Sequence, residues 1–221
     1  TGVQTCALPI SSVTAIGFGQ RIEQLNSADL AGTTATLSVD LANSVLTTVT
    51  WTAYYATTAD TFGTLASPTR TQIATGTFTV NSTVTRYSTQ ISVPAAATTG
   101  IEIVFTVGAQ TSGTWTIGNV QFEPGTVATP LERRSYGQEL QLCERYYQIA
   151  YLAAGGNGGN NEPGRHGITF KTEMRTAPTT TYSITTSTGI PSGLNAWENR
   201  TQGISVLPAG ALSGYYYYAA L

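Results

Sequence analysis

Charge is scarce in this sequence. Charged residues make up 10% of the 221 positions, whereas soluble domains typically contain about 25%. The net charge is −2, and no cluster of Lys and Arg supplies the positive patch that nucleic-acid binding needs. No apolar run approaches the roughly 20 residues of a membrane-spanning helix. The composition therefore predicts neither nucleic-acid binding nor membrane insertion. It does predict a surface made polar by hydroxyl and amide groups.

Residues that serve catalysis and metal binding are also few. The single histidine, His166, lies between Arg165 and Gly167 in a segment that we interpret as an exposed loop. The sequence therefore offers no positioned histidine that could serve as the general base of a hydrolytic triad. A glycosidase needs two carboxylates across a cleft, and no pair stands out among the acidic residues. We expect Glu102 to be exposed and Glu123 to cap a turn or to pair with Arg133 or Arg134. The sequence thus predicts no catalytic residue, and the protein is not expected to be an enzyme.

The first ten residues, TGVQTCALPI, lack an initiator methionine. They also lack the basic start and apolar run of a secretory signal. The string ACT GGA GTT CAG ACG TGT GCT CTT CCG ATC translates to the same peptide and resembles the end of a short-read sequencing adapter. We expect residues 1–10 to be a non-native scar on a fragment of environmental sequence. The alternative is a native strand cut from a longer protein. Cys6 belongs to this stretch, so only Cys143 remains and no disulfide is expected.

From residue 11 to about 130 the side chains alternate in polarity with period two. In ATLSVDLAN, Leu37, Val39 and Leu41 share one face. In TTVTWTAYY, Trp51 and Tyr55 share the apolar face, whereas Tyr54 lies with threonines on the other. Several such segments separated by turn residues, with no helical period, are typical of antiparallel sandwiches. The fold class predicted for residues 11–130 is a jelly-roll β-sandwich.

The pattern changes after residue 130. Within 131–152, ERRSYGQELQLCERYYQIA (residues 132–150) predicts a short connecting helix, with Ser135 as N-cap and Gln138 completing a capping box. Leu140, Cys143 and Tyr147 follow at helical spacing and form one apolar stripe, on which we expect Cys143 to be buried. A glycine- and asparagine-rich loop follows, and strand-like segments resume. We predict a small β-rich C-terminal domain over 153–221, truncated within its last, tyrosine-rich strand.

Three stretches resemble bacteriophage tail-fibre and tail-spike proteins. QRIEQLNSADLAGTTATLSVDLANS (residues 20–44) is similar to the opening of their carbohydrate-binding-module-like jelly rolls. GNVQFEPGTVATPLERRSYGQELQLCERYYQ (residues 118–148) is similar to the strand, turn and helix that close those domains and lead to a C-terminal receptor tip. ITFKTEMRTAPTTTYS (residues 168–183) is similar to a hairpin that follows the helix.

The resemblance implies a trimeric part of the virion that meets the bacterial surface. Related jelly rolls often carry a structural Ca²⁺, but this sequence has Gly118-Asn119 where they tend to have an Asp-Asn pair. We therefore expect no metal or other cofactor. The residues that we expect a trimer to bury are on the helix: Leu140, Cys143, Tyr146 and Tyr147.

A sugar-binding surface needs exposed aromatic rings that stack on pyranose rings. The candidates are Tyr54, Trp115, Trp197 in the predicted loop GLNAWENR, Tyr216 and Tyr218. Trp115 and the final tyrosines have an alternative interpretation as buried or interface residues.

The leading hypothesis is a non-enzymatic phage tail-fibre or tail-spike segment, located in the virion, that binds a bacterial surface glycan or protein. The alternative is a carbohydrate-binding module of a secreted or cell-surface glycoside hydrolase.

Overall fold

The computed structural model describes residues 4–7, 14–64, 66–149, 166–179 and 194–208. The chain divides into two compact units, Thr1–Arg133 and Arg134–Leu221. No helix in the described ranges is long and apolar enough to cross a membrane.

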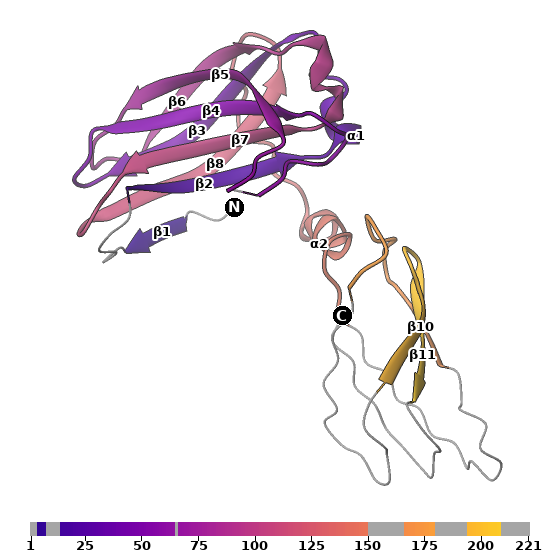
Figure 1. Ribbon diagram of the computed structural model, residues 1–221. Helices are drawn as coiled ribbons and strands as arrows, with labels where there is room; N and C mark the ends of the chain where they lie inside the picture. Colours follow the sequence, from indigo (N-terminus) through magenta and orange to yellow (C-terminus); the bar gives the residue numbers. More distant parts are fainter. Residues whose placement is uncertain (1–3, 8–13, 65, 150–165, 180–193, 209–221) are drawn as a thin grey trace, which may run out of the picture. The chain divides into compact units, whose positions relative to one another are not determined.

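The first unit is an antiparallel jelly-roll sandwich, as predicted (Figure 1). Its elements in chain order are β1 (Gln4–Ala7), β2 (Ala15–Ile22), α1 (Gln24–Ser27), β3 (Thr34–Asn43), β4 (Thr48–Ala56), β5 (Arg70–Thr79), β6 (Thr85–Ser92), the 3₁₀ turn η1 (Ala95–Thr99), β7 (Ile101–Gly108) and β8 (Thr114–Pro124). The strands form two four-stranded sheets, with orders β1-β8-β3-β6 and β2-β7-β4-β5.

The strand β1 lies at the edge of the first sheet, where it pairs antiparallel with residues 114–117 of β8. A peptide of almost any sequence can extend a free sheet edge through backbone hydrogen bonds. The pairing is therefore compatible with both origins considered for residues 1–10, and their non-native origin stays a prediction.

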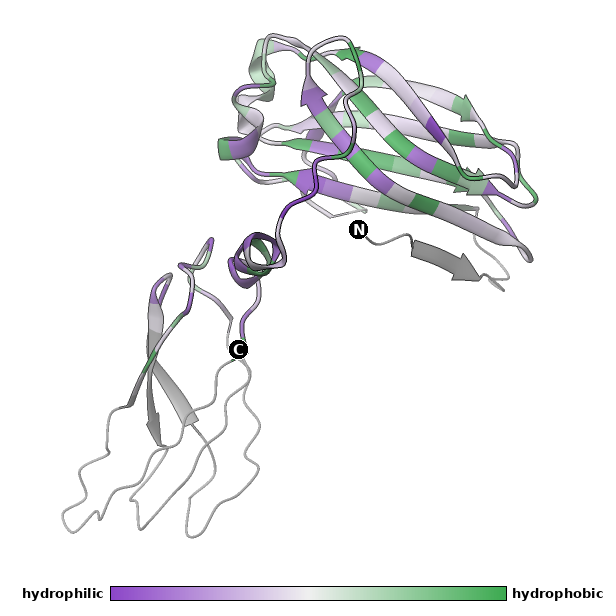
Figure 2. Ribbon diagram, turned by 180° about the vertical axis from the view of Figure 1, so that it is seen from behind, coloured by the Kyte–Doolittle hydropathy of each residue, from purple (hydrophilic) through white to green (hydrophobic). Residues whose placement is uncertain are grey.

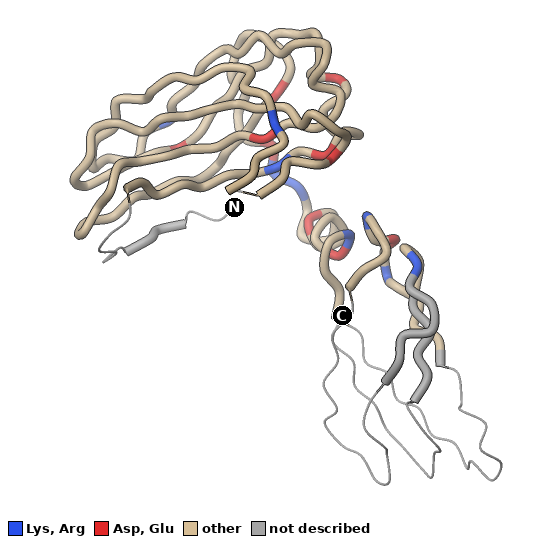
Figure 3. The backbone as a smooth tube through the Cα atoms, viewed as in Figure 1, with Lys and Arg blue, Asp and Glu red and all other residues tan. Residues whose placement is uncertain are grey.

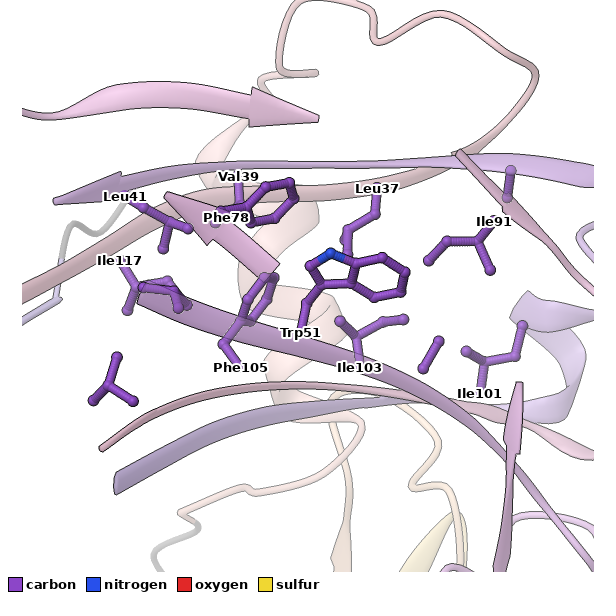
Figure 4. Packing of buried hydrophobic residues seen from close by; sticks show 14 of the residues in the cluster. Leu37, Val39, Leu41, Trp51, Phe78, Ile91, Ile101, Ile103, Phe105 and Ile117 are labelled. Carbon is purple, nitrogen blue, oxygen red and sulfur yellow. The ribbon is translucent and has the colours of Figure 1, made fainter. Parts of the chain in front are cut away.

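The core lies between the two sheets, and Figure 4 shows its packing. Alternate residues of each strand point inward because successive side chains of a strand lie on opposite faces. The largest contributors include Leu37, Leu41, Trp51, Phe105 and Ile101, all less than 7% exposed. Figure 2 shows the same alternation as green and purple segments along the strands. Burial of these side chains, at about 25 cal/mol per Å² of apolar surface, is the main stabilising term.

The indole ring of Trp51 fits its place in the core because the residue opposite it on the next strand is a glycine. Gly76 of β5 pairs with Trp51 of β4, and a Cβ placed on Gly76 would lie 2.7 Å from Cζ2 of the indole ring. The predicted core position of Trp51 is confirmed, and Gly76 is the residue that allows it.

Glu123 fixes the segment that leaves the last strand of the sandwich. Its carboxylate accepts hydrogen bonds from the Thr129 hydroxyl at 2.6 Å, the Thr129 N–H at 2.8 Å and Gln121 Nε2 at 2.8 Å. These bonds, the Thr129 hydroxyl first, lower the pKa of Glu123 below its ordinary value of 4.5. The predicted turn-capping role of Glu123 is confirmed. Arg134, considered as an alternative partner of Glu123, instead pairs with Glu139 at 3.7 Å.

The second unit begins with the predicted helix, α2 (Tyr136–Glu144). Ser135 is its N-cap, and both hydrogen bonds of the capping box with Gln138 are present. The helix is shorter than the apolar stripe suggested, so Tyr146 and Tyr147 lie beyond its end. None of its residues is buried.

The strands described in the second unit form a small antiparallel sheet, which confirms the predicted β character of these segments. Its strands β9 (His166–Thr169), β10 (Leu194–Arg200) and β11 (Gly203–Pro208) have the order β10-β11-β9. His166, expected in a loop, is therefore the first residue of a strand. Ile168, Phe170 and Met174 are buried. Gln148, also buried, binds the backbone of the segment after β9: it accepts from Lys171 N and donates to Thr172 O.

Candidate functional site

The outer face of the β2-β7-β4-β5 sheet carries side chains in three rows that cross all four strands. Strand register places the residues of each row directly opposite one another. The first row is Gly17, Thr106, Thr50 and Thr77, the second is Gly19, Val104, Thr52 and Thr75, and the third is Arg21, Glu102, Tyr54 and Gln72. We call the first two the neutral rows, and the third, together with Arg70, whose side chain reaches Glu102, the charged row.

The neutral rows present hydroxyl groups beside bare backbone. Thr52 and Thr75 hydroxyls lie 3.0 Å apart across the strand pair, and Thr75 also donates to the Trp51 carbonyl at 2.9 Å. Gly17 and Gly19 leave β2 without side chains in these two rows. Threonine hydroxyls both donate and accept hydrogen bonds, so these rows can match a ligand that carries hydroxyl groups.

The charged row is organised around Glu102. One carboxylate oxygen accepts from Arg21 Nε at 2.8 Å, and the other accepts from Arg70 Nη1. Arg70, at the start of β5, stacks on Tyr54 with its guanidinium carbon 4.1 Å from the ring centroid. Arg21 lies over Phe62 at 5.1 Å and donates to the Gly63 carbonyl at 3.2 Å. The row is thus a preorganised set of donors whose positions are fixed by several contacts.

The prediction that Glu102 is exposed is wrong. Strand alternation does place it on the outer face, but its side chain is only 7% exposed because the two arginine side chains cover it. A buried carboxylate requires such partners, since its desolvation is otherwise too costly. Glu102 therefore anchors two guanidinium groups.

The predicted aromatic contacts have different outcomes. Tyr54 does lie on the outer face, half-buried, but one side of its ring is covered by Arg70. The prediction that Trp115 is an exposed sugar-binding residue is wrong: it is 3% exposed within the core, because Trp115 and Ile117 alternate inward along β8. Its indole N–H has no hydrogen-bond partner among the described residues. Tyr55 packs partly against the same core.

The remaining aromatic candidates belong to the second unit. Trp197 lies in β10, beside an irregularity in the pairing with β11, and not in the predicted loop. Its side-chain environment, and both Tyr216 and Tyr218, fall outside the described residues.

The predicted interface residues are exposed in the single chain. Leu140 is 41% exposed, Tyr146 54% and Tyr147 62%. Cys143 is a free, exposed thiol, so the expectation that it is buried on the helix stripe is wrong for one chain alone. Neighbouring Tyr136, Leu142 and Ile149 are exposed as well, which makes this the most apolar exposed segment of the described chain.

At the position considered for a metal, an arginine supplies the positive charge. Asn119 donates to Asp40 at 2.6 Å, and Arg86 contacts Asp40 at 3.3 Å as well as the Asn119 carbonyl and, at 2.7 Å, the Ser38 hydroxyl. Within the described ranges no group of three or more His, Cys, Asp or Glu residues could hold a metal ion.

The first sheet has a shallow groove on its own outer face. It is lined by Thr36, residues 88–90 and residues 126–128. Gln90 closes part of it by donating to the Thr126 carbonyl at 2.8 Å. No arginine or aromatic ring lines this groove, so it offers fewer means of recognition than the three rows.

Sequence reasoning missed Arg21, Arg70 and the neutral rows. The alternation of Thr48, Thr50, Thr52 and Tyr54 on one face of β4 was visible, as was the Gly-x-Gly-x-Arg spacing in β2. The sequence did not predict the strand register that brings β2, β4 and β5 together with Glu102 of β7.

No protein-family model matches the sequence, and no curated protein matches it. Three solved structures share low identity with it. A CBM4 structure is 16% identical, with a TM-score of 0.38, over 49% of this chain and 61% of that chain. The enzymatically active domain of tailspike protein 4 of bacteriophage CBA120 is 20% identical, with a TM-score of 0.33, over 55% and 18%. The CBM22-1–GH10 modules of xylanase 10B of Clostridium thermocellum, complexed with xylohexaose, are 14% identical, with a TM-score of 0.30, over 54% and 21%. Each match spans less than two thirds of the other chain.

Proposed function

We propose that this chain is a non-enzymatic segment of a phage tail fibre or tail spike that binds a glycan of the bacterial surface through the three rows. The observation that carries the proposal is the combination of two hydroxyl-bearing neutral rows with a row of fixed guanidinium donors. Sugar hydroxyls need donors and acceptors in register, and donors held in place lose little entropy on binding. The virion is the location that this role implies.

The assignment to a phage particle is supported by the sequence resemblance over residues 20–44, 118–148 and 168–183. The non-enzymatic role is supported by Glu102. Both of its oxygens are bound by guanidinium groups, so it is a poor general acid or base, and glycoside hydrolysis requires a pair of carboxylates with complementary roles.

The exposed segment around α2 supports assembly into a homotrimer. A nine-residue helix is too short to be stable in isolation. Its two leucines, and the tyrosines that follow it, are exposed in one chain. Burial of Leu140, Cys143, Tyr146 and Tyr147 against two sister chains would supply the missing apolar contacts. Size-exclusion chromatography with light scattering on the full chain should give three times the monomer mass. A stable monomer with one cooperative melting transition would contradict this part.

The alternative is a carbohydrate-binding module of a secreted or cell-surface glycoside hydrolase. It is favoured by one observation, that all three rows lie within the first unit. It predicts a monomer and a hydrolase domain encoded in the same uncut gene, whereas the phage assignment predicts adjacent tail or baseplate genes.

Binding to an array of bacterial surface polysaccharides tests the glycan-binding proposal. The variant Arg70→Gln should weaken binding by about tenfold, the loss expected for a hydrogen bond from a charged donor. The matched control is Arg86→Gln, which removes an ion-paired arginine from the other sheet and should leave affinity within about twofold. Equal losses in the two variants, or no binding to any polysaccharide, would contradict the proposal.

A further inference from the structure

The distribution of charge in the first unit suggests which glycans the three rows accept. The unit Thr1–Arg133 contains four arginines and no lysine against seven acidic residues, a net charge of −3. Figure 3 shows long stretches of its strands without any charged residue. A body of this charge repels a polyanion at long range.

The three rows hold little to offset that repulsion. The neutral rows contain no charged residue. In the charged row Arg21 and Arg70 share Glu102, so their charges are already partly compensated. Two further carboxylates lie toward the same end of the sheet: Glu23 directly follows β2 and is buried, and Asp60 accepts from Gln24 N at 2.9 Å. Counted together, Arg21 and Arg70 against Glu102, Glu23 and Asp60 give a net charge of −1 at this end of the sheet (two positive, three negative), so an anionic ligand would lose its hydration without meeting a net positive charge.

Hydrogen-bond donors nevertheless remain available. Arg21 is 51% exposed, and the Glu102 carboxylate and the Gly63 carbonyl occupy two of its five N–H groups. The threonine hydroxyls of the neutral rows add donors and acceptors without charge. Such a set suits the hydroxyl groups of an uncharged sugar.

We propose that the three rows select neutral glycans and discriminate against polysaccharides that carry carboxylates. This inference rests on the proposed glycan-binding function and specifies its ligand class. Thr50 and Thr77 are its contact residues in the first row, and the charged row forms one border of the site.

The test uses the full chain and an array of bacterial surface polysaccharides, each in its native form and after chemical reduction of its carboxylates to alcohols. We expect neutral polysaccharides to bind, carboxylate-bearing ones to bind only after reduction, and affinity to change by less than about twofold between 50 and 500 mM salt, because no counter-ions are released. Stronger binding of the native acidic forms, or an affinity that falls more than about tenfold with salt, would overturn the inference while leaving glycan binding intact. Binding to none of the polysaccharides would overturn both.

Two pairs of variants sharpen the result. Thr50→Val with Thr77→Val removes two hydroxyls without changing shape and should weaken binding of the neutral polysaccharide by about tenfold; Thr34→Val on the first sheet is the matched control. Gln72→Lys adds a positive charge to the charged row and should allow native acidic polysaccharides to bind, whereas Ser88→Lys on the first sheet should not. If Gln72→Lys and Ser88→Lys behave alike, charge in this row does not set the selectivity and the inference fails.

Discussion

The guanidinium carbon of Arg70 lies over the Tyr54 ring, 4.1 Å from its centroid, and the same guanidinium contacts Glu102. Tyr54 therefore supports an arginine whose side chain stays 15% exposed, so part of that side chain belongs to the surface offered to a ligand. A planar donor whose position is set by a ring and a carboxylate loses little freedom when it binds a second partner.

This relationship predicts different effects for two substitutions of Tyr54. Tyr54→Phe keeps the ring and should leave glycan affinity within about twofold, since cation–π stacking depends on the ring face. Tyr54→Ala removes the support for Arg70 and should weaken binding by about tenfold, with a smaller loss of stability because the ring is only half-buried. Isothermal titration with the best-binding polysaccharide of the array measures both. Loss of binding in Tyr54→Phe would indicate that the phenol, and not the stack, is the contact.

Trp115 should behave as a core residue. Trp115→Ala should lower the free energy of unfolding by about 3–5 kcal/mol, the usual cost of truncating a buried aromatic residue. Trp115→Phe should cost less, because it also removes an indole N–H that has no partner in the described chain. Urea denaturation measures the stability of each variant. Glycan affinity of the folded fraction should be unchanged; a selective loss of affinity would contradict the core assignment.

How far the sequence predicted these features depended on the range of the interaction. The sandwich, the core position of Trp51 and the capping box at Ser135 were all predictable, because each follows from alternation or spacing within a few residues. The charged row was not predictable, because Arg21, Glu102, Tyr54 and Arg70 come from four strands whose pairing the sequence does not specify.

Two errors show the same limit. Glu102 was expected to be exposed because alternation places it on the outer face, but its burial comes from side chains of neighbouring strands. Trp197 was placed in a loop, yet it lies within β10, between Ala196 and Glu198, which both pair with β11.

The close approach of Gly76 to Trp51 predicts a clear difference between two glycines of the same sheet. Gly76→Ala should destabilise the protein by about 1–3 kcal/mol, because the new methyl group would overlap the indole ring. Gly17→Ala is the control: its Cβ would lie 3.5 Å from the Thr106 methyl, an ordinary contact, so the change should stay within about 0.5 kcal/mol. Thermal and urea unfolding of both variants provide the comparison. Equal stability of the two would mean that Trp51 does not pack as described.

Glu123 should make the segment after β8 sensitive to acid. Its pKa is lowered in the folded protein, first by the Thr129 hydroxyl. The stabilisation it provides is therefore present above its ordinary pKa of 4.5 and is lost as the pH falls through the lowered folded value. Limited proteolysis within residues 125–132 should accelerate as the pH falls below that ordinary value.

The variant Glu123→Gln provides the comparison for that prediction. It should be cleaved faster than the parent at neutral pH and should lose the pH dependence, whereas Glu132→Gln, an exposed neighbour, should keep it. A pH profile that is the same in parent and Glu123→Gln would show that another group controls this segment.

The most direct test of the account is to map the bound glycan on the protein by NMR. In the full chain with ¹³C-labelled threonine methyl groups, the strongest-binding polysaccharide is cut to short oligomers and titrated in. The account predicts shifts for Thr50, Thr52, Thr75 and Thr77 on the outer face of the β2-β7-β4-β5 sheet, while Thr34 and Thr36 of the other sheet stay unchanged. Shifts confined to Thr34 and Thr36, or to threonines of the second unit, would contradict it.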